Sequence, residues 1–404
     1  MKKLFVIGIA ALLLVAFTMP AMAKVKIGGI IFTDFYYIDR DKENALARGI
    51  GDGKTSYNTT AIQLPNITRL YGRWTNEDNV GMYIEFGIGQ TGGAIDDASD
   101  NGVGLRHAYG WWDVNPMFQI MAGKSTTPFS PLNPSQLIGT RSGEVNIIGV
   151  GYGDFYSGRF VQVRGTFNFG KVARLAIALV DPNGKLAAGD LHPVTSGVNN
   201  TTIPRIDIGV PLYLGPVHLY PGFCYQHRSY DNSTYGGKPI DNNINSYIGS
   251  LGAKLGVGPF GLAAEGNWGK NWANMRGLAG VSPSVAWRAD GVNPISAATV
   301  DASNKIHDAE TYSWWVDLSF KFGPVTPHVM YGQQKSKNVL IGTNTKVEAK
   351  TQMVGFSVPI DLAKGFRIRP ECMWYDDGDG QVAGSKSTDF GKYAIYGVQF
   401  QITF

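Results

Sequence analysis

The chain ends with the segment Lys392-Tyr393-Ala394-Ile395-Tyr396-Gly397-Val398-Gln399-Phe400-Gln401-Ile402-Thr403-Phe404. Counted back from the end, every second residue is apolar or aromatic, and the residues between them are largely polar. Because successive side chains of a β-strand point to opposite faces, the segment is predicted to be a strand with one apolar face. Such a strand suits either a membrane-spanning barrel or a soluble β-sandwich, and the rest of the chain must distinguish them.

Residues 1–23 have the pattern of a signal peptide. Lys2 and Lys3 precede an apolar run, and Ala21-Met22-Ala23 supplies a small-residue cleavage site. Without this segment the formal charge falls from +4 to +2, because two lysines and no acids are lost. That balance gives no reason to expect a nucleic-acid partner. No later stretch approaches the ~18 unbroken apolar residues of a spanning helix.

The composition indicates an all-β protein. The sequence has 52 Gly, 19 Tyr, 20 Phe and 9 Trp, with only 17% charged residues. Glycine and aromatic residues suit strands, turns and the aromatic girdles of membrane barrels. No Pro/Ser-rich linker or charge block divides the chain, so residues 24–404 are predicted to form a single domain.

Segments of about ten residues with alternating hydrophobicity recur along the whole mature chain, which is the pattern of barrel strands. The clearest is Tyr312–Phe322, where the apolar set alternates with Ser313, Trp315, Asp317, Ser319 and Lys321. About sixteen strands are predicted, at Val25–Tyr37, Gln63–Trp74, Val80–Ile88, Leu105–Trp112, Phe118–Gly123, Phe160–Phe169, Ala173–Val180, Arg205–Leu212, Val217–Gln226, Tyr247–Leu255, Phe260–Gly269, Tyr312–Phe322, Val325–Gln333, Gln352–Ile360, Phe366–Tyr375 and Lys392–Phe404.

The connections between these strands alternate in length. Tight turns such as Gly323-Pro324 alternate with long polar loops. The first long loop is expected to extend to about Ala61, and the longest loop spans about Asn271–Glu310. The two ends of a β-sandwich have no reason to differ systematically in loop length. Closure into a barrel also removes the exposed sheet edges that so many strands would otherwise present. We therefore predict a transmembrane antiparallel β-barrel closed by pairing of Lys392–Phe404 with Val25–Tyr37.

The alternation is interrupted between Lys124 and Gly158, where Pro128, Pro131 and Pro134 lie in about 35 residues. With the signal peptide, the strand number and the terminal Phe404, this long third loop makes the chain resemble the general-diffusion porins of the Gram-negative outer membrane. The segment Gly123-Lys124-Ser125-Thr126-Thr127-Pro128-Phe129 is also similar to a Gly-x-x-x-x-Pro-Phe turn of several porin families.

The resemblance implies that residues 124–158 fold into the barrel as a constriction loop and that three chains associate. It also implies that the barrel-assembly machinery reads Phe404, and that lipopolysaccharide and lipid surround the outer wall. The sequence departs from the family at the loop tip, which lacks an acidic Pro-Glu-Phe-Gly-Gly-like motif. The charges of this region are mixed instead: Lys124, Arg141, Glu144, Asp154 and Arg159.

A charge at the lipid midplane costs ~2–4 kcal/mol, so charges on strands are expected to face the lumen. The basic residues assigned to that face are Lys26, Arg69, Arg73, Arg106, Arg164, Arg174, Arg205, Lys254, Lys321, Arg367 and Arg369. The acids assigned there are Asp34, Glu85, Asp207, Glu265, Asp317 and Glu371. Basic groups therefore outnumber acids on the predicted inner face.

An excess of arginine would enrich anions in a low-dielectric channel, although neighbouring acids neutralising these arginines would leave the pore nearly non-selective. The best candidates for the constriction wall are Arg69, Arg73, Arg106 and Arg164, because their strands flank or precede the long loop. The full set predicted to line the pore or constriction is Arg69, Arg73, Glu85, Arg106, Glu144, Asp154, Arg164, Arg174, Arg367 and Arg369.

The sequence lacks Gly-x-Ser-x-Gly, His-Glu-x-x-His and Cys-x-x-Cys-His motifs, so no enzyme activity, metal or cofactor is predicted. Cys224 and Cys372 are expected to be unpaired, because they fall on opposite faces of non-adjacent strands. The predicted function is passive diffusion of small hydrophilic solutes and ions. Three alternatives stay open: a porin selective for phosphate, another anion or a sugar; a barrel enclosing an electron-carrying cytochrome; and an outer-membrane hydrolase.

Overall fold

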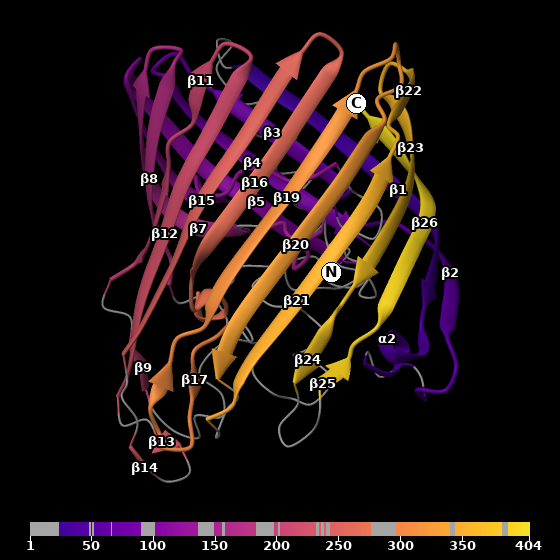
Figure 1. The fold of residues 1–404 in the computed structure, drawn as a ribbon. Helices are drawn as coiled ribbons and strands as arrows, with labels where there is room; N and C mark the ends of the chain where they lie inside the picture. Colours follow the sequence, from indigo (N-terminus) through magenta and orange to yellow (C-terminus); the bar gives the residue numbers. More distant parts are fainter. Residues whose placement is uncertain are drawn as a thin grey trace.

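The computed structural model describes residues 24–404 apart from 48–49, 51, 66, 90–101, 136–148, 156–157, 183–197, 201–202, 232–233, 236–237, 240–242, 276–295, 340–343 and 382–386. Nearly all regular structure in the described residues is β (Figure 1). Helix is confined there to α2 (Lys42–Ala47) and the single 3₁₀ turn η1 (Trp272–Asn274). Neither is long enough to cross a membrane, and no helix of the described residues is.

One antiparallel sheet closes into a barrel of sixteen strands, as predicted. Three of the sixteen are interrupted, so that two labelled elements share one place in the wall. The wall consists of β1 (Lys24–Arg40), β2 (Tyr57–Gln63) with β3 (Arg69–Thr75), β4 (Val80–Gly89), β5 (Gly102–Asn115), β6 (Phe118–Thr126), β7 (Arg159–Phe169), β8 (Ala173–Val180), β10 (Arg205–Gly209) with β11 (Leu212–Leu214), β12 (Val217–Asp231), β15 (Asn243–Val257), β16 (Phe260–Lys270), β19 (Glu310–Phe320), β20 (His328–Val339), β21 (Lys346–Ser357) with β22 (Ile360–Ala363), β23 (Phe366–Asp376) and β26 (Lys392–Thr403).

Short strands extend the sheet or form ribbons at the end of the barrel that carries the long loops (Figure 1). β9 pairs with the end of β12, whereas the other six form three two-stranded ribbons. These elements are β9 (Val198–Asn200), β13 (Thr234–Tyr235), β14 (Lys238–Pro239), β17 (Thr299–Val300), β18 (Ile306–His307), β24 (Asp379–Gln381) and β25 (Ser387–Asp389). The tight turns and the C-terminus lie at the opposite end of the barrel.

The barrel closes through the predicted pairing of the last strand with the first. β26 is antiparallel to β1 over eleven consecutive residue pairs, from Ile30↔Thr403 to Arg40↔Tyr393. Beyond the last strand residue, Gly29 and Phe404 exchange two backbone hydrogen bonds, with N–O distances of 3.2 and 3.1 Å. The other side of β1 pairs with β2 and β3, so neither edge of this strand is left open.

The two faces of the wall differ in polarity. Exposed apolar side chains cover the outside, as on β7, where Val161, Val163, Phe167 and Phe169 alternate with inward polar residues. Aromatic residues gather at two levels on this face: Tyr37, Trp268, Trp314, Trp374 and Tyr396 toward the long loops, and Trp112, Phe169, Phe260, Phe322 and Phe404 toward the tight turns. An apolar band between two aromatic belts is the outer surface of a barrel that spans a membrane.

Several strands are longer than predicted, mostly at the loop end. β2 begins at Tyr57, within the stretch expected to be a loop up to Ala61, and residues 64–68 separate it from β3. β12 continues to Asp231 and β15 begins at Asn243. Outside the apolar band both faces of a strand are polar, so the backbone hydrogen bonds continue without the alternation that marks a strand in the sequence.

The two cysteines are unpaired, as predicted. Cys224 is buried on the inner face of β12, and Cys372 lies on β23. These two strands are not neighbours in the wall.

Phe404→Asp is expected to reduce the amount of folded protein in the membrane several-fold and to leave single-channel conductance unchanged. The Phe404 side chain is 64% exposed on the outside, where a charge near the interface costs only about 0–1 kcal/mol, so loss of the aromatic terminus should act on assembly. Heat-modifiable migration of membrane extracts measures the folded fraction. Phe404→Tyr, which keeps the ring, is the control; normal levels of Phe404→Asp would contradict the assigned role.

Candidate functional site

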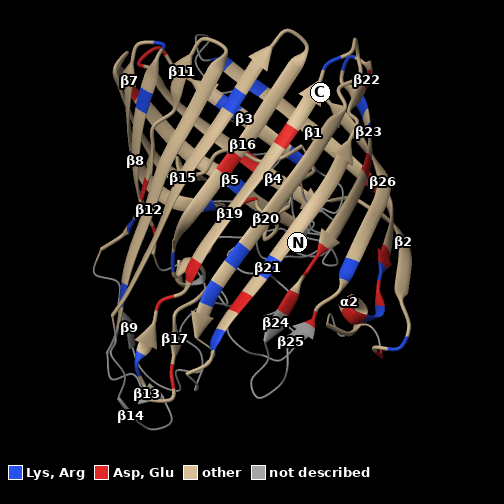
Figure 2. Cartoon of the chain, viewed as in Figure 1, with Lys and Arg blue, Asp and Glu red and all other residues tan. Residues whose placement is uncertain are grey.

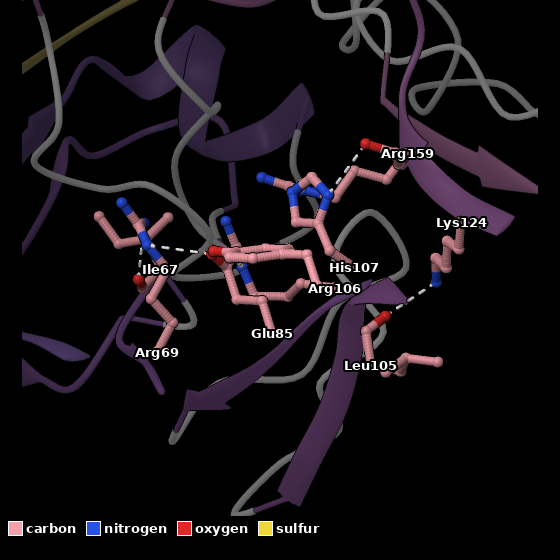
Figure 3. Close-up of polar contacts among 10 residues, drawn as sticks. Ile67, Arg69, Glu85, Leu105, Arg106, His107, Lys124 and Arg159 are labelled. Carbon is pink, nitrogen blue, oxygen red and sulfur yellow. Dashed lines mark hydrogen bonds and ion pairs between the residues drawn. The ribbon is translucent and has the colours of Figure 1, made fainter. Parts of the chain in front are cut away.

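The inner face of β3, β4 and β5 carries a cluster of charges around one carboxylate (Figure 3). The Arg106 guanidinium donates from Nε to Glu85 Oε1 at 2.7 Å, and Arg69 Nε lies 3.7 Å from Glu85 Oε2. Glu85 and Arg106 are buried, whereas the side chain of Arg69 is 26% exposed. The structure thus brings together three residues that were predicted from three separate strands.

A β-bulge places Arg106 in this cluster. Glu85 pairs with His107 and Phe86 with Leu105, so Arg106 is an extra residue on β5. The bulge turns two consecutive side chains, Arg106 and His107, toward the interior. Simple alternation predicts that His107 points outward, which is why the sequence did not identify it.

His107 connects β5 to the start of β7. Arg159 donates from Nε to His107 Nε2 at 2.9 Å, so Nε2 is the acceptor and the ring is neutral with its proton on Nδ1. Nδ1 lies 3.3 Å from Ser125 Oγ and is the donor of that bond. Arg159 therefore adds a third arginine to the cluster around Glu85 (Figure 3).

Three further predicted arginines lie on the same side of the barrel. Arg73 stands over the Trp111 ring at 4.8 Å, Arg164 donates to the Thr126 carbonyl at 3.4 Å, and Arg174 lies 6.0 Å from the Tyr213 ring. Within the part of the chain that the structure describes, none of the three forms an ion pair with a carboxylate. The wall from β3 to β8 thus presents several arginines whose contacts are rings and carbonyls.

The two remaining predicted arginines lie on β23. Arg369 donates to the Ser135 carbonyl at 3.3 Å and lies 3.9 Å from Glu371, and it is buried. Arg367 is 2.6 Å from Asp361 near the tight-turn end. These two residues are therefore separated from the cluster around Glu85, and both have a nearby carboxylate. Glu144 lies outside the described residues.

Described residues of 124–158 contact residues of β16 and β19 to β26, on the other side of the barrel from the arginines of β3 to β8. Ser130 bonds both Glu265 on β16 and the Phe155 carbonyl, and the Ser135 amide donates to Asp317 on β19 at 2.8 Å. Tyr152 packs in a buried cluster with Met330, Met353, Tyr375 and Tyr393, which come from β20, β21, β23 and β26.

Glycines on the barrel strands allow residues of 124–158 to come close to the wall. A Cβ on Gly209 would lie 2.2 Å from the Pro128 carbonyl oxygen, and one on Gly332 would lie 2.3 Å from the Tyr152 carbonyl oxygen. Similarly, a Cβ on Gly252 would lie 2.9 Å from the Leu132 side chain. Three strands therefore lack a side chain at these points; the neighbour is backbone at Gly209 and Gly332 and the Leu132 side chain at Gly252.

Asp154, which was predicted to line the pore or constriction, is fully buried within this segment. Neither of its carboxylate oxygens accepts a well-formed hydrogen bond from the described residues. Burial, with Glu265 as a second and smaller cause, raises the pKa of Asp154 well above its ordinary value of 3.8. The Asp154 carboxyl therefore favours its neutral form.

Some inner charges were missed because strands were predicted too short. Arg40 and Arg228 are buried on the inner face of β1 and β12, just beyond the predicted ends of those strands. Arg159 was assigned to the long loop and begins β7 instead. Among the described residues, no group of His, Cys, Asp and Glu has the arrangement of a metal site.

No protein-family model and no curated protein matches this sequence. Solved structures do match, over almost the whole chain. The outer membrane channel DcaP of Acinetobacter baumannii is 18% identical with a TM-score of 0.65, covering 96% of this chain and 99% of that one. The anion-selective porin from Comamonas acidovorans is 14% identical with a TM-score of 0.58, covering 95% and 100%. OmpF of Salmonella typhi is 13% identical with a TM-score of 0.54, covering 94% and 98%. The chain therefore has the fold of outer-membrane porins.

Gly332→Val is expected to displace Tyr152 and its neighbours from the wall, because the new side chain would overlap the Tyr152 carbonyl. Overpacking of this kind costs about 1–3 kcal/mol, so the midpoint of thermal unfolding should fall. Gly266→Val is the matched control, since a Cβ there has only Ser313 O at 3.9 Å. Equal midpoints for the two variants would show that the glycine is not needed for this contact.

In the Asp154→Asn variant, the free energy of unfolding is expected to decrease less than in the wild type as pH rises above about 4. The folded state holds the Asp154 proton to a higher pH than the unfolded state, so it binds more protons and stability decreases with pH by up to about 1.4 kcal/mol per unit in that window. The amide removes this contribution. Thermal unfolding between pH 4 and 8 measures it, with exposed Asp52→Asn as the control; parallel curves for wild type and Asp154→Asn would refute the assignment.

Proposed function

We propose that the mature chain is an outer-membrane porin that forms a water-filled channel for passive diffusion of small hydrophilic solutes and ions. The observation that carries this proposal is the closed barrel with an apolar outer face and an inner face that holds arginines and carboxylates. Charged groups on the inner face of a barrel of sixteen strands favour a hydrated interior. The porin fold of the solved structures supports the same reading.

In this proposal residues 124–158 narrow the channel. Contacts of Ser130, Ser135 and Tyr152 with strands from β16 to β26 support a position inside the barrel. Because the segment covers that side, the remaining passage runs along the wall from β3 to β8. The residues that then border it are Arg69, Arg73, Arg164 and Arg174, with Arg69 paired to Glu85, which Arg106 also bonds.

The channel is proposed to prefer anions mildly. Glu85 is shared by Arg69 and Arg106, so one carboxylate balances two guanidinium groups there. Arg73, Arg164 and Arg174 add positive charge without a carboxylate partner among the described residues. A narrow, low-dielectric wall of this sign raises the local concentration of anions. An equal balance of charges and a non-selective pore is the competing outcome.

The remaining assignments follow from the same proposal. Residues 1–23 are a signal peptide that is removed on export, Phe404 is read by the barrel-assembly machinery, and three chains associate in the outer membrane. Lipid and lipopolysaccharide contact the outer wall. A channel selective for phosphate, another anion or a sugar is a narrower form of this function, marked by saturable block of conductance by one solute.

Single-channel recording of the purified protein is expected to show discrete conductance steps and, under a salt gradient, a reversal potential of the sign for anions. Replacing Arg69, Arg73 and Arg164 together by Gln should lower the anion-to-cation permeability ratio about twofold or more, because three positive charges leave the wall. Near 1 M salt the difference should shrink, since the Debye length falls to about 3 Å.

The control carries the same charge change away from the channel, with Lys54, Lys171 and Lys364 of exposed loops and turns replaced by Gln. It should leave the reversal potential unchanged. An absence of conductance steps would end the porin assignment. A cation preference in the wild type, or the same shift in the control, would end the anion assignment while leaving the channel intact.

A further inference from the structure

Two cross-strand rows on the inner face lie between the segment 124–158 and the tight turns. The first row, on β12, β15, β16 and β19, is His218↔Lys254↔Ala263↔Asp317. The second row is one step nearer the turns, on β15, β16, β19 and β20, and is Gly256↔Gly261↔Ser319↔His328. Figure 2 shows charged segments on strands of this wall toward the tight turns. The two rows thus place polar side chains at both ends of a floor of small residues.

These rows line a groove of about 500 Å³. That volume is within the range of small-molecule sites in proteins, about 300–1,000 Å³. The floor is open because Gly256, Gly261 and Ala263 carry no long side chain. Neighbouring strands are about 4.8 Å apart, so Lys254 on β15 and Ser319 on β19 bound the groove about 10 Å apart. The groove can therefore hold one small solute that extends across two strands.

One end of the groove presents an ammonium group without a counter-charge. Lys254 is exposed, and it has no ion-pair partner among the described residues. Its cross-strand neighbour His218 packs edge-on against the Tyr213 ring, with 5.1 Å between the ring centroids. The His218 ring nitrogens form no hydrogen bond within the described part of the chain. Lys254 and His218 therefore offer unused donors to one carboxylate group.

The other end presents neutral hydrogen-bonding groups. Asp317 Oδ1 lies 2.8 Å from His328 Nδ1, and Asp317 Oδ2 accepts a bond from the Ser135 amide at 2.8 Å. Because an ionised carboxylate only accepts, His328 carries a proton on Nδ1, which leaves Nε2 of the neutral ring as an acceptor. The Ser319 hydroxyl lies over Gly261, where a Cβ would overlap it, and it has no partner among the described residues. Ser319 and His328 therefore suit the hydroxyl groups of a ligand.

We propose that this groove, defined by His218, Lys254, Ser319 and His328, binds a small carboxylate that carries several hydroxyl groups, such as a sugar acid. The carboxylate lies between Lys254 and His218, and hydroxyl groups bond Ser319 and Nε2 of His328. A neutral sugar would leave the Lys254 charge without a counter-ion. A simple alkyl acid would place methylene groups against Ser319 and His328, which then lose their hydrogen-bond partners.

The groove lies next to the segment proposed to narrow the channel. On the adjacent inner row toward the long loops, the Leu132 side chain lies over Gly252, and Ser130 bonds Glu265. A solute that has passed this segment therefore meets the groove before it reaches the tight-turn end of the barrel. The inference rests on the proposed channel for this route. The binding groups themselves are separate from the arginines of β3 to β8.

Saturation-transfer NMR of the detergent-purified protein, titrated with gluconate, tests the proposal. The wild type is expected to bind gluconate about tenfold more tightly than glucose, which lacks the carboxylate, or hexanoate, which lacks the hydroxyl groups. Lys254→Gln removes a charge-assisted hydrogen bond, so it should weaken gluconate binding about tenfold and leave glucose binding unchanged. Ser319→Ala removes a neutral hydrogen bond, so it should weaken gluconate binding about threefold and leave hexanoate binding unchanged.

The control is Lys171→Gln, the same charge change on the exposed turn between β7 and β8, which should bind gluconate like the wild type. Heat-modifiable migration shows that each variant is folded. Equal affinity of the wild type for the three solutes, unchanged gluconate binding by Lys254→Gln, or the same loss in the control would overturn the site. Single-channel recording of the same samples keeps the two proposals apart. Conductance steps without gluconate binding would refute the groove, whereas gluconate binding without steps would refute the channel and support the groove.

Discussion

The structure depends on closure of the sheet between its first and last strands. In a bilayer each unpaired backbone amide or carbonyl costs several kcal/mol, so an open edge of a strand as long as β1 is not tolerated. β1 satisfies both of its edges, with β26 on one side and β2 and β3 on the other. The reciprocal bonds of Gly29 and Phe404 bring this pairing to the end of the chain. The other features of the barrel, on its inner and outer faces, depend on this pairing of β1 with β26.

Closure of the sheet creates an interior whose two sides carry different kinds of side chains. The wall from β10 to β26 is built to receive a chain segment: glycines lie where backbone passes, and Glu265 and Asp317 accept bonds from Ser130 and Ser135. The wall from β3 to β8 carries arginines held by Glu85, by rings and by carbonyls. In the proposed channel, covering one side would leave the passage against the other, so the segment proposed to narrow it would also select which charges border it.

The alternation of side chains was enough to predict about sixteen strands, the closing pair and the inward direction of Arg69, Glu85 and Arg106. It was not enough for His107 and Arg159. A bulge changes the face of every residue on one side of it, and nothing in the local sequence marks Arg106 as the extra residue. The glycines at 209, 252 and 332 were also uninformative alone, because the residues that they contact lie in a segment far away in sequence. Strand ends were missed where both faces turn polar.

The outward lysines show how the rule for charges has to be read. Phase along a strand tells which face a side chain occupies, and inside the apolar band that face must be the lumen if the residue is charged. Lys335 and Lys350 have the phase of the outer face, yet they lie beyond Tyr331 and Val354, where the outer medium is no longer hydrocarbon. The face on which a side chain lies therefore does not decide whether it contacts hydrocarbon. Its position relative to the aromatic belt decides this. A charge beyond that belt is compatible with the barrel, and Glu348 on the same face supplies a counter-charge to Lys335 and Lys337.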